Sequence, residues 1–144
     1  AARRAGRPCV ISFTVETDGR LPTGQSIEAA ITEVDAATDD GPIYYMINCA
    51  HPSHFAERLC GGDRWRERIG GVRANASCKS HDELNEATEL DRGDPEDLAR
   101  LYRDLRERLP RLTVLGGCCG TDHTHIAAIA RACAGRPSTC NDKA

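Results

Sequence analysis

The chain contains 144 residues, which is the usual length of one domain. Hydrophobic residues make up 40% of it and charged residues 28%, proportions typical of a globular protein. The net charge of −3 gives no electrostatic basis for binding nucleic acid or a membrane surface. The longest apolar runs are far shorter than a membrane span, and no signal peptide is visible. We therefore expect neither nucleic acid nor a membrane as a partner.

The first half of the chain alternates between strand and helix patterns. Residues 1–7 are small and basic, which indicates a linker or the truncated end of a helix. Residues 8–15 form a short β-branched and aromatic run that predicts a buried strand. A second strand is expected at 43–47, followed by a short helix from His51-Pro52 to about Leu59. Between the two strands, apolar residues recur at the spacing of an amphipathic helix: Ile27, Ala30, Ile31 and Val34.

The second half continues the alternation. Residues 70–77 are the third expected strand, predicted from position as much as from pattern, and the polar, acidic residues 78–93 predict a long loop. Asp94 is the expected cap of a helix that begins at Pro95 and ends before Pro110. Its buried stripe should consist of Leu98, Leu101, Tyr102, Leu105 and Leu109.

The last unit carries the most unusual motif of the chain. A fourth strand at 112–115 leads into Gly116-Gly117-Cys118-Cys119-Gly120-Thr121, and Thr121 is the expected cap of the last helix. Residues 136–144 are expected to form a disordered tail. The buried stripe of the last helix should consist of Ile126, Ile129, Ala130 and Cys133.

The order of these elements predicts an α/β fold. Four strand–helix units in succession indicate a parallel sheet with right-handed crossovers. Residues 8–135 would form this domain, as either a small open sheet or half of an eight-unit barrel. A complete barrel needs about 250 residues, which this chain does not have.

Three cysteines follow strands that end at the same edge of such a sheet. Cys49 comes directly after the second strand, and Cys118 and Cys119 come after the fourth. The carboxyl ends of parallel strands face one edge, so these thiols can converge. Three thiolates with one open position form a zinc site that can accept a substrate atom. The alternative is that they are small buried hydrophobic residues, against which the glycines around Cys118 argue.

The other cysteines suit a structural role better, and with eight in the chain disulfide bonds remain an alternative to reduced thiols. We favour a reducing compartment and therefore a cytoplasmic protein, because metal-binding thiols need reducing conditions. These cysteines are Cys9, Cys60, Cys78, Cys133 and Cys140.

The histidines give weaker signals. His51 is nearest to the expected ligands and is a candidate to hold them in position without binding the metal itself. His54, His123 and His125 are expected to be solvated in first helical turns, and His81 lies in a polar loop and is uninformative. No arrangement of serine and histidine suggests a protein nucleophile, so we expect no catalytic side chain beyond the metal ligands.

At its cysteine motifs the chain resembles the zinc- and homocysteine-dependent methyltransferase family. The resemblance covers roughly residues 8–134, and it rests on several segments in the right order: Ser12-Phe13-Thr14, Asp18-Gly19-Arg20, Gly24-Gln25-Ser26, Asn48-Cys49-Ala50, Asn75-Ala76 and Gly116 to Thr121. It implies a TIM barrel of which this chain is the second half, strands five to eight.

The resemblance also implies the chemistry. Zn²⁺ would be bound by Cys49, Cys118 and Cys119, and the sulfur of homocysteine would take the open position. A methyl donor would then convert homocysteine to methionine; donors in the family include S-methylmethionine, S-adenosylmethionine, betaine and methylcobalamin. Thr14 and Asn75 are the candidates for substrate contacts.

Two partners and two alternative functions follow from these expectations. Half a barrel leaves sheet edges unpaired, so the chain should associate with the missing N-terminal half or with a second copy of itself. The chain would be a methyltransferase fragment, the homocysteine-activating module of a cobalamin-dependent methionine synthase, or a non-catalytic zinc-binding interaction module.

Overall fold

A computed structural model of the protein describes residues 1–60 and 64–135 and contains one parallel sheet. Its four strands lie in sequence order: β1 (Val10–Thr14), β2 (Tyr44–Asn48), β3 (Ile69–Ala74) and β4 (Val114–Gly117). All three neighbouring pairs are parallel. The predicted α/β class is therefore confirmed, and each predicted strand is present.

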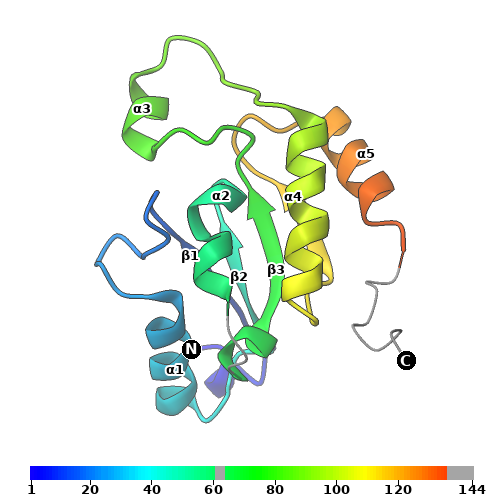
Figure 1. Cartoon of the computed structure of the whole chain (residues 1–144). Helices are drawn as coiled ribbons and strands as arrows, with labels where there is room; N and C mark the ends of the chain where they lie inside the picture. Colours follow the sequence, from blue (N-terminus) through cyan, green and yellow to red (C-terminus); the bar gives the residue numbers. More distant parts are fainter. Residues whose placement is uncertain (61–63, 136–144) are drawn as a thin grey trace.

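Helices connect the strands and pack mainly on one face of the sheet (Figure 1). The α-helices are α1 (Ile27–Thr38), α2 (Pro52–Phe55), α3 (His81–Glu86), α4 (Pro95–Arg108) and α5 (His123–Ala132). Short 3-10 helices are η1 (Arg3–Ala5), η2 (Ala56–Leu59) and η3 (Arg64–Arg68). None of the helices in the described part of the chain is long and apolar enough to cross a membrane.

Local sequence signals account for the helix starts. The Ser26 hydroxyl accepts a hydrogen bond from the amide of Ala29 at the start of α1. Asp94 caps α4 as predicted, with Pro95 in the first turn, and its carboxylate accepts from the amide of Glu96. These caps satisfy amides that have no partner within the helix and so fix where each helix begins.

The core lies between the sheet and the helices. Side chains on one face of the central strands are fully buried, among them Tyr45, Ile47 and Val72. The alternate residues face the other side, where Val10 is 39% exposed and Ser12 and Arg73 are also exposed. Parallel sheets are usually covered on both faces, so within the described part of the chain one face of this sheet lacks its usual cover.

The prediction of a continuous loop at residues 78–93 is wrong in part. These residues contain α3. Ser80 and Glu83 form a capping box in which each side chain bonds the other residue's backbone amide. This reciprocal pair starts a short helix in a segment whose sequence has no apolar stripe from which a helix could be predicted.

The last helix differs from the prediction in its cap and in its buried face. Asp122, rather than Thr121, is the N-cap of α5. His125, Ala128 and Ile129 are buried, whereas Ile126 is 44% exposed, so the expected stripe is rotated about the helix axis. The predicted tail at 136–144 lies outside the described residues.

Candidate metal centre

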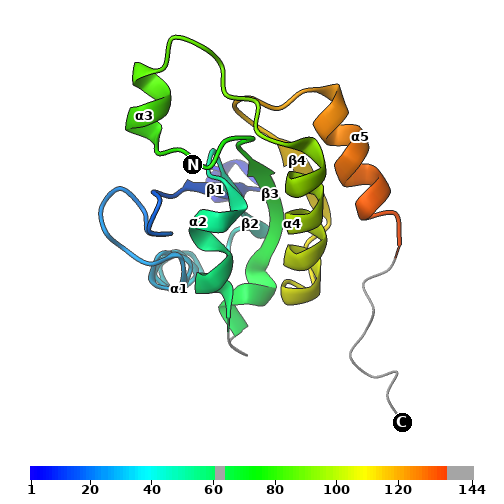
Figure 2. The same ribbon diagram turned by 45° about the horizontal axis from the view of Figure 1, so that its top comes forward.

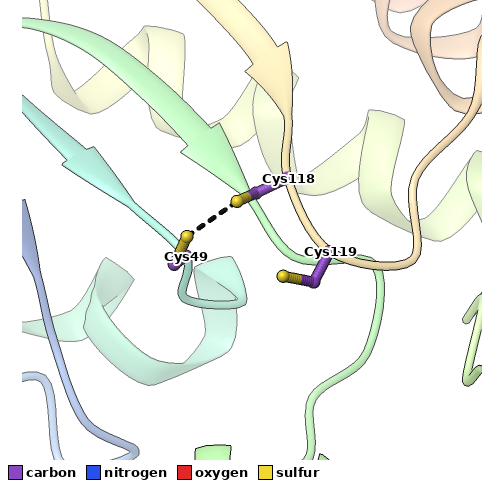
Figure 3. A group of neighbouring side chains, drawn as sticks. All are labelled: Cys49, Cys118 and Cys119. Carbon is purple, nitrogen blue, oxygen red and sulfur yellow. Dashed lines mark hydrogen bonds between the residues drawn. The ribbon is translucent and has the colours of Figure 1, made fainter.

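Three thiols meet at the carboxyl ends of β2 and β4. Cys49 follows β2, Cys118 and Cys119 follow β4, and their sulfur atoms all lie within 4.8 Å of one another. The Sγ atoms of Cys49 and Cys118 are 2.7 Å apart. Figure 3 shows the three side chains pointing toward a common point between the two strand ends. The structure thus brings together the three cysteines that the sequence singled out.

Backbone hydrogen bonds continue past the strand ends and place these cysteines. The Cys49 amide donates to the carbonyl of Arg73 (3.0 Å), and the Cys118 amide donates to the carbonyl of Ala74 (2.8 Å). The Ala76 amide donates to the carbonyl of Cys119 (2.9 Å). The segment after β3 therefore lies between the two cysteine segments and sets their separation.

Cys49 has a left-handed backbone, with φ of 53°. This conformation costs about 1–2 kcal/mol for a residue with a Cβ atom, so its surroundings must hold it. Two donors reach the Cys49 carbonyl oxygen: Asn75 Nδ2 at 3.0 Å and His81 Nε2 at 2.7 Å. Together they fix the peptide that follows Cys49 and so direct its thiol toward Cys118.

Asn75 connects the segment that contains Cys49 to the segment that contains Cys119. Its Nδ2 donates to the Cys49 carbonyl, and its Oδ1 accepts from the Cys119 amide at 3.2 Å. The side chain is 2% exposed. The sequence suggested Asn75 as a substrate contact, and in the structure its amide is bonded to the protein backbone on both sides.

Glycine is required at the last residue of β4 and at one position of the turn that follows. A Cβ atom on Gly117 would lie 2.1 Å from the hydroxyl oxygen of Thr121. Gly120 has φ of 78°, and a Cβ there would lie 2.4 Å from the carbonyl oxygen of Asp91. A larger residue at either position would force these neighbours to shift, which explains the two glycines that directly flank the cysteine pair.

Thr14 lies on the open face of the sheet, near the strand ends. Asn48 Nδ2 donates to Thr14 Oγ1 at 3.0 Å, and the Ser12 hydroxyl donates to Asn48 Oδ1. These three polar side chains form a chain across β1 and β2, next to the start of the Cys49 segment.

Burial raises the pKa of the Cys49 thiol above its ordinary value, and the hydrogen bond with Cys118 raises it further. Without a metal this thiol stays protonated at neutral pH. A cation that binds the three sulfurs must therefore displace protons, and its affinity should increase with pH.

The sulfur arrangement suits a zinc ion. Zinc prefers thiolate ligands at ~2.3 Å, and sulfurs in a tetrahedron of that size lie ~3.8 Å apart. The sulfur separations here, from 2.7 Å to within 4.8 Å, span this value. Three protein ligands leave one tetrahedral position for another ligand.

A cavity of about 340 Å³ adjoins the thiols, between the strand ends and the segment that contains α3. Figure 2 shows α3 beyond the carboxyl ends of the strands, apart from the helices that cover the sheet. Larger hollows are lined by residues at the amino ends of the strands, such as Cys9 and Ile43. The cavity next to the thiols is lined by Cys49, Cys119, Gly120, Asn75, Ser77, His81, Leu84, Asn85 and residues 87–91.

The remaining candidates occupy varied positions. His51 is buried and caps α2, with its Nδ1 2.8 Å from the Ser53 hydroxyl. His125 was expected to be solvated but is 1% exposed, and its Nε2 is bonded to the Arg92 carbonyl at 2.8 Å. Cys60 and Cys78 are exposed rather than buried. Every described cysteine is a free thiol.

His81 is the site residue that the sequence analysis missed. It is the first residue of α3 and contacts the backbone of a cysteine 32 positions earlier. The pattern Ser80-x-x-Glu83 is the signal that could have indicated an ordered segment here.

Comparisons with a family profile and with individual proteins point to the same family. The sequence profile of the family described as homocysteine S-methyltransferase matches residues 1–133. The chain is 32% identical over 137 residues to methionine synthase of Mycobacterium tuberculosis and 30% identical over 145 residues to methionine synthase of Mycobacterium leprae. These matches cover 93% and 99% of the chain but 11% of each relative. No solved structure matches the chain.

Proposed function

This chain belongs to the homocysteine S-methyltransferase family, and we propose that it supplies the zinc- and thiol-binding part of an enzyme that transfers a methyl group to homocysteine, giving methionine. The observation that carries the proposal is the convergence of Cys49, Cys118 and Cys119 within 4.8 Å at one edge of a parallel sheet. An edge of this kind is where α/β proteins build their sites. The chain spans 11% of the length of the curated relatives that it matches.

The three cysteines would hold Zn²⁺ and leave its fourth position for the homocysteine sulfur. A bound zinc ion would keep that sulfur as a thiolate, which is the nucleophilic form. The residues of this chain would orient it: Asn75 and His81 hold the Cys49 backbone, and Asn75 also holds the Cys119 backbone. No side chain of this chain needs to accept a proton from the substrate.

The proposal extends to the surroundings of the site. We propose that residues 8–135 form the half of a TIM barrel that contains strands five to eight. Residues 1–7 and 136–144 would lie outside this half-barrel. The exposed side chains on the open sheet face, and the edge strands β1 and β4, support a covering partner. The N-terminal half of the barrel or a second copy of the chain would fill this place. The free thiols suit a reducing compartment such as the cytoplasm.

A second candidate function is favoured by the relatives. Both are methionine synthases of which the chain matches 11%. The chain would then be the homocysteine-activating module of a cobalamin-dependent enzyme, with the same thiol site and a corrinoid-binding domain elsewhere in the protein. Thr14 and Asn75 remain proposed substrate contacts in either case, and the two candidate functions differ in the methyl donor.

Calorimetry tests the proposed function. Reduced, zinc-loaded protein of full natural length is titrated with homocysteine and, as a control, with homoserine, whose hydroxyl replaces the thiol. We expect binding of homocysteine alone, with release of a proton that appears as a buffer-dependent heat. Zinc binding without homocysteine binding would support a non-catalytic zinc module, and a protein without zinc would overturn the proposal.

A further inference from the structure

The imidazole of His81 lies between the ends of β1 and β2. Its Nε2 is 2.7 Å from the Cys49 carbonyl oxygen, and its Nδ1 is 3.3 Å from Glu16 Oε2. Glu16 follows β1 closely, and Cys49 follows β2. The side chain of His81 is 32% exposed, so the ring is not part of the core. The contacts at its two nitrogens nevertheless hold it in place.

The contact with Cys49 has a defined direction. Because Nε2 faces a carbonyl oxygen, it carries a hydrogen and donates it. Nδ1 faces a carboxylate oxygen, which also accepts, so the ring bonds both Cys49 and Glu16 only when each nitrogen carries a hydrogen. The carbonyl also accepts from Asn75, so both of its lone pairs are used. This carbonyl belongs to a residue in a left-handed backbone conformation, which relaxes readily to other conformations unless its peptide is held.

The segment that carries His81 is anchored at both ends. The capping box of Ser80 and Glu83 sets the start of α3. The Ser77 hydroxyl donates to Asp91 Oδ2 at 2.8 Å, which closes the segment on itself. The His125 ring, bonded to the Arg92 carbonyl, ties the far end of the segment to α5. The position of His81 is therefore determined by the fold and does not depend on the metal site alone.

We propose that His81 is a positioning residue that aims the Cys49 thiol at the metal and that Glu16 orients its ring. This inference rests on the proposed function, because it assumes that the three cysteines bind zinc. Partners that orient metal ligands typically contribute 10–100-fold to metal affinity. His81 acts on the carbonyl of a ligand residue rather than on the ligand atom, so its effect is expected in metal retention and site geometry.

Three variants of the full-length protein separate this role from a general structural one. His81→Ala removes the donor, and His81→Gln places an amide N–H near the position of Nε2. His123→Ala is the matched control, because His123 is exposed on α5. The readouts are zinc release to a chromogenic chelator, the absorption spectrum of the cobalt-substituted protein, and thermal unfolding of the metal-free protein.

We expect His81→Ala to release zinc about 10–100-fold faster and to weaken the cobalt–thiolate bands. His81→Gln should recover most of the wild-type zinc retention and most of the intensity of the cobalt–thiolate bands. His123→Ala should match the wild type in both measurements. Should His81→Ala fail to fold, Glu16→Ala, which leaves the ring untethered, should accelerate zinc release in the same direction. Release at the wild-type rate from His81→Ala, or from Glu16→Ala in that event, would overturn the inference. If the wild type itself binds no zinc, the proposed function fails first.

Discussion

The sulfur atoms of Cys49 and Cys118 lie 2.7 Å apart although 69 positions separate these residues in the chain. They follow strands that are not neighbours, since β3 lies between β2 and β4. The register of two strand pairs therefore determines whether the thiols meet. A metal site with this origin depends on the integrity of the whole sheet edge.

Replacing one thiol should remove the metal. Cys118→Ser leaves two sulfurs, and a hydroxyl is a poor zinc ligand at neutral pH. We expect about one zinc per chain in the wild type and almost none in the variant, measured by metal analysis of reduced protein. Cys78→Ser is the control, because Cys78 is exposed and outside the cluster. Retention of a full zinc equivalent by Cys118→Ser would contradict the ligand assignment.

The cysteine positions were predictable because they depend on element order. The strand pattern and the rule that parallel strands end at one edge of a sheet predict that Cys49 and Cys118 lie close together. The contributions of His81 and His125 were not predictable in this way. Each bonds a backbone carbonyl more than 30 positions away, and such contacts leave no periodic signal in the sequence. The rotated face of α5 has a related cause, since burial of His125 rather than Ile126 depends on the segment packed against it.

Removing the amide of Asn75 should affect stability and metal affinity together. Asn75→Ala leaves the Cys119 amide without its side-chain acceptor and the Cys49 carbonyl with one donor fewer. We expect a loss of about 1–3 kcal/mol in the free energy of unfolding and a drop of about 10–100-fold in zinc affinity. Denaturant unfolding and chelator competition measure the two effects. Asn85→Ala, at an exposed position, should change neither substantially.

The hydroxyl of Tyr102 links α4 to β3 and β4. It accepts from the Ala74 amide at 3.0 Å and lies within hydrogen-bond distance of the carbonyls of Val72 and Gly116. Its burial raises the pKa of Tyr102 to about 12, so the hydroxyl stays neutral. Tyr102→Phe removes the hydrogen bonds that join α4 to the backbone of both strands and should lower the free energy of unfolding by about 1 kcal/mol. Tyr44→Phe, on the open face, is the control; an equal loss there would refute this role.

An ion pair between α1 and η3 should make stability depend on pH. Arg68 donates two hydrogen bonds of 2.9 Å to Asp35, and the Tyr45 hydroxyl donates a third of 2.7 Å. The bonds from Arg68 lower the pKa of Asp35 in the folded state. The folded pKa is below the unfolded one, so the stabilisation is present above the ordinary aspartate pKa of about 3.9 and is lost as the pH falls through the folded pKa.

The comparison of wild type with Asp35→Asn checks this prediction. The charged hydrogen bonds should make the wild type more stable by roughly 1.5–3 kcal/mol at pH 7. That advantage should shrink below pH 4 as Asp35 is protonated. Urea unfolding at several pH values measures it. A difference that is the same at pH 3 and pH 7 would show that the charge of Asp35 is not the cause.

The central claim is that three cysteines of this chain bind zinc and leave one position for a substrate thiolate. X-ray absorption at the zinc edge, on full-length protein with and without homocysteine, tests it most directly. The account predicts three sulfur neighbours at ~2.3 Å in the free protein and four after homocysteine is added. A sulfur number that does not change on adding saturating homocysteine, or fewer than three sulfurs in the free protein, would contradict it.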